Sequence, residues 1–248
     1  MVAELRSRDR VLAALHHVEP DRVPINYACN PGIDARLKAY YGLASADDEG
    51  LRQVLGVDFL GVAAPYVGRK LHADIPDRQV DLWGVRTRWV QHESGGYWDF
   101  CDFPLAQATE EDAAAWPMPS PDDYDYAAIS EQCRRMDHYC LYVGHAGIGC
   151  IINRIAKLRG MAQVLVDLLT GDPVTMLLVK RKQEIELEIM RRSIEAAKGR
   201  IDFLWMGEDL GTQIGPMISL GLYRREIRPW HQRFVDLAKS YGLPVMFH

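Results

Sequence analysis

The stretch Phe203–Pro216, FLWMGEDLGTQIGP, constrains the fold of this chain more than any other segment. It continues an apolar run from Ile201, and such a run without polar alternation is typical of a strand buried on both faces of a parallel sheet. The run breaks at Gly207, and Glu208 and Asp209 follow it directly. In parallel α/β folds, the loops at the carboxyl ends of strands hold the ligands. We therefore expect Glu208 and Asp209 to be catalytic; the alternative is that one of them caps a turn or holds the loop.

Four further apolar runs have the same character, and helical patterns separate most of them. We predict parallel strands, adjacent in chain order, at Val23–Asn26, Val57–Ala63, Tyr139–Gly144, Ile201–Met206 and Leu243–Phe247. The expected helices cover residues 4–17, 33–41, 47–55, 124–136, 150–170 with a break at Gly160, 173–198, and 220–241, which Pro229 should kink or divide. This alternation predicts one α/β domain over residues 1–248, with a parallel sheet and outer helices.

The segment at about 77–105 differs from the rest of the chain. It holds VDLWGVRTRWV and GGYWDFCDFPL, whose alternation and aromatic content are typical of an antiparallel β-hairpin. We expect this hairpin to be an insertion that lies outside the central sheet, over one of its ends. Its aromatic side chains would either line a flat apolar ligand or pack the hairpin itself; they are Trp83, Trp89, Tyr97 and Trp98.

Composition argues against several classes of partner. The net charge is −5 and no basic block is present, which argues against nucleic acid. No apolar run reaches the roughly 18 residues that a membrane helix needs, and the charged amino terminus lacks the apolar core of a signal peptide. Five widely spaced cysteines favour a reduced, cytoplasmic protein over a disulfide scaffold.

The number of predicted strands limits the choice of architecture. Five strands are fewer than the eight of a closed (β/α)₈ barrel, and the sequence stops at the end of a strand. We therefore expect an incomplete TIM barrel with about five of its strands present. The alternative is an open sheet.

Several segments together resemble the uroporphyrinogen decarboxylase (URO-D) superfamily. They are RDRVLAALHHVEPDRVPI, LGVDFLGV, VDLWGV, the HAGIG-to-LRG stretch, GEDLGTQIGP with its LYRREIRPW helix, and AKSYGLPVMFH. That superfamily includes the decarboxylase of porphyrin biosynthesis and zinc-dependent methyltransferases that take a methyl group from a corrinoid. The resemblance covers essentially the whole chain. It implies a TIM barrel with its active site at the carboxyl ends of the strands, of which this sequence lacks the last part.

Two features of the sequence separate the branches of this superfamily. The decarboxylase carries an arginine-rich RQAGR element after its first strand, whereas this chain reads INYACNPG there, without arginine between Pro24 and Arg36. A polyanionic porphyrinogen requires bidentate guanidinium partners, so the difference favours the methyltransferases. Their last strand continues as His-x-Cys. The resemblance therefore implies that His248 is a zinc ligand in a longer form of the chain.

The implied function is a zinc-dependent methyltransferase that moves a methyl group between a corrinoid, free or on a corrinoid protein, and a thiol or similar acceptor. One alternative is uroporphyrinogen decarboxylase, which needs no cofactor, and a second is a non-catalytic barrel that binds a tetrapyrrole. The residues expected to bind substrate are Asn26, Tyr66, His145 and Gln213, and Asn153 and Arg154 are expected to face the pocket. For His145, the alternative is a structural hydrogen bond.

Overall fold

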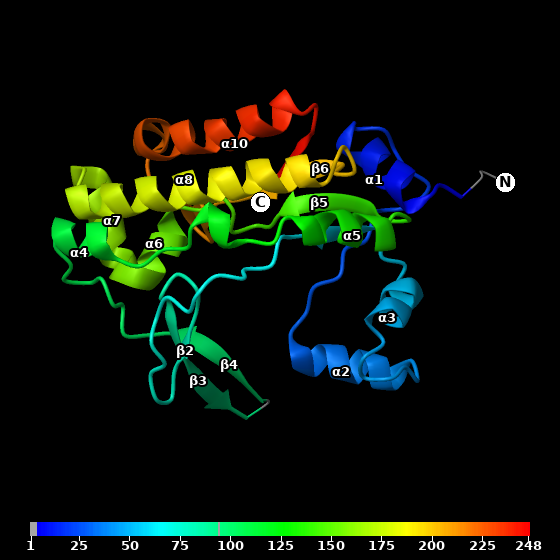
Figure 1. Cartoon of the computed structure of the whole chain (residues 1–248), viewed down its shortest axis with the longest axis horizontal. Coiled ribbons are helices and arrows are strands. Elements are labelled where there is room, and N and C mark those ends of the chain that lie inside the picture. The colour runs from blue at the N-terminus through cyan, green and yellow to red at the C-terminus, as the bar shows by residue number, and fades with distance from the viewer. Residues whose placement is uncertain (1–3, 94) are drawn as a thin grey trace.

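The computed structural model describes residues 4–93 and 95–248 as an α/β fold built on a four-stranded parallel sheet (Figure 1). The strands lie side by side in chain order as β1 (Phe59–Val62), β5 (Cys140–Gly144), β6 (Phe203–Met206) and β9 (Val245–Phe247). Four of the predicted strands, their parallel direction and their order are therefore confirmed.

The strand predicted at Val23–Asn26 is wrong. This segment is extended beside β1, but it is not a strand of the sheet. Pro24 has no N–H that could form a hydrogen bond to a neighbouring strand. Side chains, rather than backbone groups, form most of the hydrogen bonds between this segment and the start of β1. The N–H of Ile25 donates to the Asp58 carboxylate at 2.9 Å, and the Asn26 side chain donates to a β1 carbonyl at 2.9 Å. One backbone hydrogen bond, from Asp58 N–H to the Ile25 carbonyl at 2.8 Å, also joins the two segments.

Helices cover one face of the sheet. They are α5 (Ala127–Arg135), α8 (Pro173–Ala196) and α10 (Arg228–Ser240), each of which precedes the next strand of the sheet. Successive residues of a strand point to opposite faces, and the alternate apolar ones point to these helices. The core of this layer contains Val62, Leu141, Val143, Leu204 and Met206 from the strands, with Ile129, Met190, Ile194 and Phe234 from the helices.

The opposite face of the sheet carries aromatic side chains. Phe59, Tyr142 and Phe203 form a cluster whose ring centroids are 5.1 to 6.0 Å apart, and Trp205 continues it. Helix α1 (Ser7–Leu15) packs on this face at the amino ends of the strands, where its Val11 is buried against the cluster.

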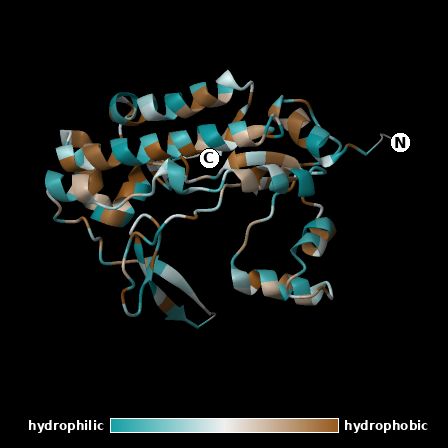
Figure 2. Ribbon diagram, viewed as in Figure 1, coloured by the Kyte–Doolittle hydropathy of each residue, from teal (hydrophilic) through white to brown (hydrophobic). Residues whose placement is uncertain are grey.

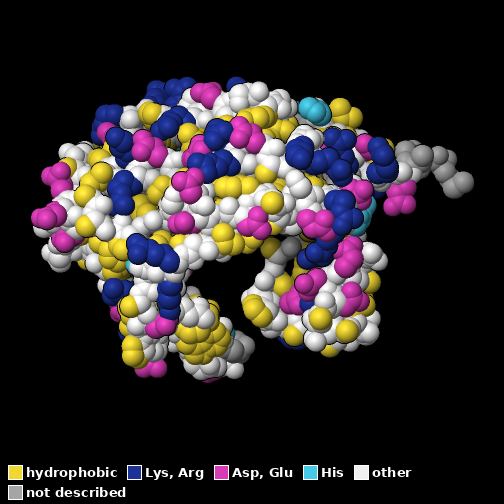
Figure 3. All heavy atoms as spheres, viewed as in Figure 1, with side chains coloured by type: hydrophobic (Ala, Val, Ile, Leu, Met, Phe, Trp, Pro, Cys, Tyr) yellow, Lys and Arg dark blue, Asp and Glu magenta, His cyan; other side chains and the backbone are white. Residues whose placement is uncertain are grey.

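A separate antiparallel sheet lies outside the parallel one, as predicted for the hairpin insertion. It consists of β2 (Gln79–Val80), β3 (Arg86–His92) and β4 (Gly95–Phe100), one strand more than expected. The predicted turn residue Ser94 lies outside the described residues. Trp89 and Trp98 face each other across β3 and β4 with ring centroids 5.6 Å apart, so both pack the hairpin itself. The hairpin projects from the body of the molecule with an apolar surface (Figure 3).

Shorter elements complete the chain. These are α2 (Pro31–Tyr40), α3 (Asp48–Leu55), α4 (Glu110–Ala115), η1 (Pro121–Asp123), α6 (Ile152–Arg159), α7 (Met161–Thr170), β7 (Gly211–Thr212), β8 (Gly215–Pro216), α9 (Leu220–Leu222) and the π-helical turn η2 (Tyr223–Ile227). Both predicted helix breaks are confirmed. Gly160 separates α6 from α7 with a φ of +91°, and Pro229 lies in the first turn of α10, directly after the π-helical turn.

Helix α8 carries both polar and apolar residues around its surface (Figure 2). In the described part of the chain, no single helix is both long enough and apolar enough to cross a membrane. The pair α7 and α8, bent by 99° at their junction, passes such a test only when taken together.

Candidate functional site

Glu208 lies at the carboxyl end of β6 and is completely buried. Its carboxylate accepts the N–H groups of Ile151 at 2.5 Å and Ile152 at 3.3 Å, and the thiol of Cys150 donates to it at 3.1 Å. Because α6 begins at Ile152, these N–H groups are ones that lack a partner within the helix. Burial raises the pKa of Glu208. These contacts are those of a side chain that caps a helix. Capping was the alternative role in the sequence analysis, and a catalytic role for Glu208 stays a prediction.

A second buried titratable side chain, His231 of α10, lies next to Glu208. Its Nε2 atom is 3.9 Å from a Glu208 oxygen, and 3% of the residue is exposed. Burial lowers the pKa of His231 to about 4, so the imidazole is neutral at neutral pH.

Asp209 has a different environment, because about half of its side chain is exposed. The amide of Asn153, from the first turn of α6, donates a short hydrogen bond to it. His248, which follows β9, places Nδ1 3.4 Å from the other carboxylate oxygen. We refer to Asp209, Asn153 and His248 as the rim cluster. The structure thus brings together two predicted site residues, Asp209 and His248, that are far apart in the sequence. Within the ranges 4–93 and 95–248, no three His, Cys, Asp or Glu side chains form a group that could hold a metal ion.

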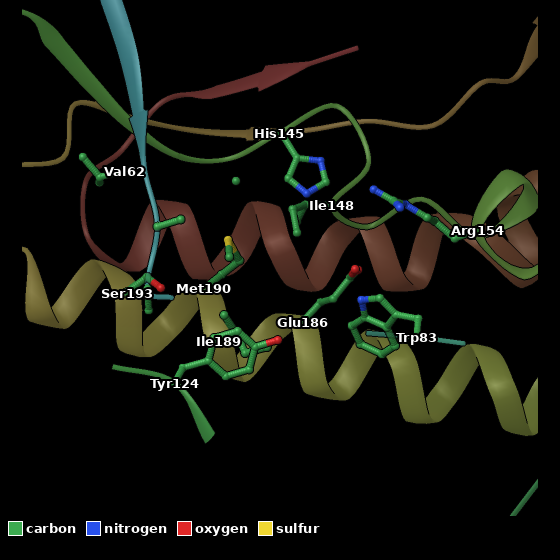
Figure 4. A pocket seen from close by; sticks show the side chains of 13 residues that line it. Val62, Trp83, Tyr124, His145, Ile148, Arg154, Glu186, Ile189, Met190 and Ser193 are labelled. Atoms are coloured by element: carbon green, nitrogen blue, oxygen red, sulfur yellow. The ribbon is translucent and has the colours of Figure 1, made fainter. Parts of the chain in front are cut away.

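A cavity of about 180 Å³ lies at the carboxyl ends of β1 and β5, beside α8 (Figure 4). We refer to it as the α8 cavity. Its lining consists of Val62, Ala63, Ala64, Trp83, Tyr124, Gly144, His145, Ile148, Arg154, Glu186, Ile189, Met190 and Ser193. Most of these side chains are apolar, and the polar ones come from four different segments.

His145 lines the α8 cavity and also makes the structural hydrogen bond that was its alternative role. The N–H of Gly147 donates to His145 Nδ1 at 2.9 Å. An imidazole that accepts at Nδ1 carries its proton on Nε2 when it is neutral. Desolvation by the surrounding residues, followed by the charge of Arg154, lowers the pKa of His145, which favours its neutral form although part of the residue is exposed.

Glu186 brings a negative charge to the α8 cavity, and a neighbouring lysine neutralises it. Lys182 Nζ is 2.5 Å from Glu186 and both side chains are buried, while the N–H of Gly149 donates to the same carboxylate at 3.3 Å. Lys182 also lies 5.2 Å from the centre of the Trp83 ring.

The other predicted substrate-binding residues lie elsewhere. Asn26 holds the extended segment against β1, as described above. The Tyr66 hydroxyl donates to the Arg69 carbonyl at 2.7 Å, and the Tyr66 ring packs on Tyr124 with centroids 5.4 Å apart. Gln213 is exposed in the turn between β7 and β8. None of these three residues lines the α8 cavity.

Sequence reasoning found some of the residues around these sites and missed others. Asn153 and Arg154 were expected to face a pocket; Arg154 lines the α8 cavity, and Asn153 belongs to the rim cluster, where it donates to Asp209. The missed residues are Lys182, Glu186 and His231. Lys182 and Glu186 are four residues apart on one helix, a spacing that also describes an ordinary solvated pair. No local pattern distinguishes His231 from an exposed helical histidine.

Comparison with known proteins adds no family to these observations, since no protein-family model matches the chain and no curated protein matches it.

Proposed function

We propose that this chain is a methyltransferase of the URO-D superfamily type, which moves a methyl group between a corrinoid and a thiol or similar acceptor. The observation that carries the proposal is the rim cluster. It groups a carboxylate, an amide and an imidazole at the carboxyl ends of parallel strands, where α/β enzymes bind their ligands.

The sheet topology supports a TIM barrel as the complete architecture. In an open doubly wound sheet, the strand order reverses and helices cover both faces. Here the order runs in one direction as β1-β5-β6-β9, and the helices between these strands cover one face. That is the arrangement of consecutive barrel strands. The aromatic side chains on the other face would then fill the barrel interior.

The rim cluster suits a histidine that binds a metal. Metal-binding histidines commonly donate their second ring N–H to a carboxylate, which fixes the orientation of the ring. Asp209 lies near Nδ1 of His248 in this way, so Nε2 is the nitrogen that would bind zinc. Bound zinc would convert a thiol acceptor into its thiolate, which is the nucleophile for methyl transfer. Asp209 would orient His248, and Asn153 would hold Asp209.

The proposal is tested by following methyl transfer directly. A form of the chain extended beyond His248, so that further zinc ligands are present, is mixed with methylcobalamin, 2-mercaptoethanol and zinc sulfate, and loss of the methyl–cobalt absorbance is recorded. The 248-residue chain, which holds His248 as its one expected zinc ligand, serves as the control without activity. We expect zinc-dependent demethylation. The variant Asp209→Ala should reduce its rate at least 100-fold, whereas Asp137→Ala, which removes another exposed carboxylate, should leave the rate unchanged.

Two other outcomes would each reject the methyltransferase. Decarboxylation of uroporphyrinogen without transfer from methylcobalamin would favour the decarboxylase alternative. Binding of cobalamin or porphyrin without turnover of either would favour a non-catalytic tetrapyrrole-binding barrel.

A further inference from the structure

We propose that the α8 cavity is a binding site for a small organic carboxylate with an apolar body, and that Arg154 binds its carboxylate group. This site is separate from the rim cluster, and the proposal does not depend on methyl transfer. The argument rests on the size of the cavity, its balance of charge and the position of the arginine.

The size of the cavity limits the ligand. The cavity has a volume of about 180 Å³, well above the roughly 10–15 Å³ that a single bound water needs on this measure. This suits a molecule the size of benzoate or hexanoate and excludes a tetrapyrrole. Apolar side chains form much of the wall, including Val62, Ile148 and Ile189. Binding pockets with an apolar wall and a few polar groups select ligands that have an apolar body and one polar end.

The balance of charge selects an anion. Two opposite charges cancel within the wall, because Lys182 is paired with Glu186 at 2.5 Å. The guanidinium of Arg154 has no hydrogen-bond or ion-pair partner among the described residues, and Figure 4 shows it pointing toward the cavity. The lining itself holds one positive and one negative side chain, Arg154 and Glu186, and the adjacent Lys182 neutralises Glu186, so the charge of Arg154 is left uncompensated at the cavity. A guanidinium group binds a carboxylate through two parallel hydrogen bonds, which makes a carboxylate the preferred anion.

Gly147 leaves room for the guanidinium of Arg154 beside the cavity. A Cβ atom built on Gly147 would lie 2.2 Å from Nη2 of Arg154, so the guanidinium occupies space that only glycine leaves open. On the same side of the cavity, His145 has its Nδ1 occupied by the Gly147 N–H, which leaves Nε2–H as a second donor for an anion. The Trp83 indole supplies a flat apolar surface for the ligand body.

The experiment compares three acids with their own amides. Benzoate, hexanoate and acetate, with benzamide, hexanamide and acetamide, are titrated into the 248-residue chain and followed by calorimetry or ligand-observed NMR. We expect at least one acid to bind at least 10-fold more tightly than its amide. Arg154→Gln should abolish that preference, because it removes the charge and keeps a polar side chain.

A second variant tests position rather than charge. Gly147→Ala keeps the arginine but displaces its guanidinium, and we expect it to weaken binding of the acid at least 5-fold. The matched control Arg36→Gln, at an exposed arginine on α2, should bind the acid as the unmodified chain does. Circular dichroism verifies that each variant is folded.

The proposal is overturned if none of the acids binds more tightly than its amide, or if Arg154→Gln, once shown to be folded, retains the preference. Neither outcome depends on methyl transfer, so failure here is distinguishable from failure of the proposed function.

Discussion

Glu208 and Asp209 are neighbours in the sequence but lie in opposite environments. The backbone turns after Gly207, so that Glu208 points back under α6 and Asp209 points to the rim. Glu208 is buried and accepts two N–H groups and a thiol, whereas Asp209 is half exposed and contacts Asn153 and His248. Loss of the Glu208 carboxylate should therefore affect stability, and loss of the Asp209 carboxylate should affect activity.

We predict that substitution of Glu208 lowers stability much more than substitution of Asp209. Glu208→Ala leaves the buried Ile151 N–H without an acceptor and should lower the free energy of unfolding by about 1–3 kcal/mol. Glu208→Gln keeps an acceptor oxygen and should cost less. Asp209→Ala should change the free energy of unfolding by less than about 0.5 kcal/mol. Urea denaturation measures all three, and an Asp209→Ala cost equal to that of Glu208→Ala would contradict this division of roles.

The pKa of His231 predicts a pH dependence of stability. Burial lowers it from 6.5 to about 4, so between these values the unfolded chain binds a proton that the folded chain does not. The contribution of neutral His231 to the free energy of unfolding is complete above pH 6.5 and is lost as the pH falls to 4. Its magnitude is on the order of 3 kcal/mol. His231→Phe, which fills similar space without a titrating group, should therefore gain stability relative to the unmodified chain as the pH falls.

Urea denaturation at a series of pH values measures this difference. The exposed His16 provides the control, since His16→Phe should keep the pH dependence of the unmodified chain. Parallel curves for His231→Phe and the unmodified chain between pH 6.5 and 4 would show that His231 does not titrate as described.

At the scale of elements, a buried arginine attaches α1 to the sheet. Arg10 is 2% exposed. Its guanidinium donates to Asp21 at 2.6 and 2.8 Å, to Asp58 at 2.7 Å and to the Leu5 carbonyl at 2.6 Å. The apolar side of α1 is small, with Val11 as its buried apolar residue, so these polar contacts are central to its position.

We predict that Arg10→Met lowers the free energy of unfolding by about 3–5 kcal/mol, because it leaves Asp21 without its guanidinium partner and leaves the buried Asp58 with Arg22 alone. Arg6, on the exposed side at the start of the same helix, pairs with Asp9 in solvent. Arg6→Met should therefore change stability by less than about 1 kcal/mol. The comparison uses urea denaturation; equal costs for the two variants would argue against anchoring by Arg10.

The antiparallel hairpin should be dispensable for the parallel sheet. The Cys101 N–H donates to the Arg86 carbonyl at 3.0 Å, so the two ends of the hairpin lie close enough for a short link. Replacing residues 87–100 with two glycines should keep the helical circular dichroism signal and a single unfolding transition. Loss of cooperative unfolding in that variant would show that the hairpin belongs to the core.

At the scale of the whole molecule, the aromatic face of the parallel sheet is only partly covered by other elements. Helix α1 packs at its amino end, while Phe59, Trp205 and Met246 remain partly exposed. Strands β1 and β9 are the edges of the described sheet. Exposed apolar faces and unpaired edges promote association between molecules.

We therefore predict that the 248-residue chain self-associates. Met246→Lys places a charge on both the β9 edge and the aromatic face, and it should lower the average mass measured by light scattering. A control substitution on the far side of the molecule, Lys239→Glu on α10, should leave that mass unchanged. A strictly monomeric unmodified chain would contradict the prediction.

The sequence by itself determined the elements that depend on local patterns. Apolar runs of five to seven residues identified the strands of the sheet, because strands buried on both faces need no polar alternation. Gly160 and Pro229 marked the helix breaks through backbone conformation and a missing N–H donor. Both kinds of signal arise from residues close together in the chain, so no knowledge of distant contacts was needed.

Only the tertiary structure decided which side chains meet. The extended segment 23–26 is apolar like a strand, but the side chain of Asp58, more than 30 residues away, takes the N–H that a ladder would use. Glu208 became a cap because Ile151, 57 positions earlier, brings the start of α6 to it. Lys182 and Glu186 form a buried pair only because α8 packs beside the ends of β1 and β5. Such contacts depend on the free energy of packing distant segments together, which local sequence periodicity does not contain.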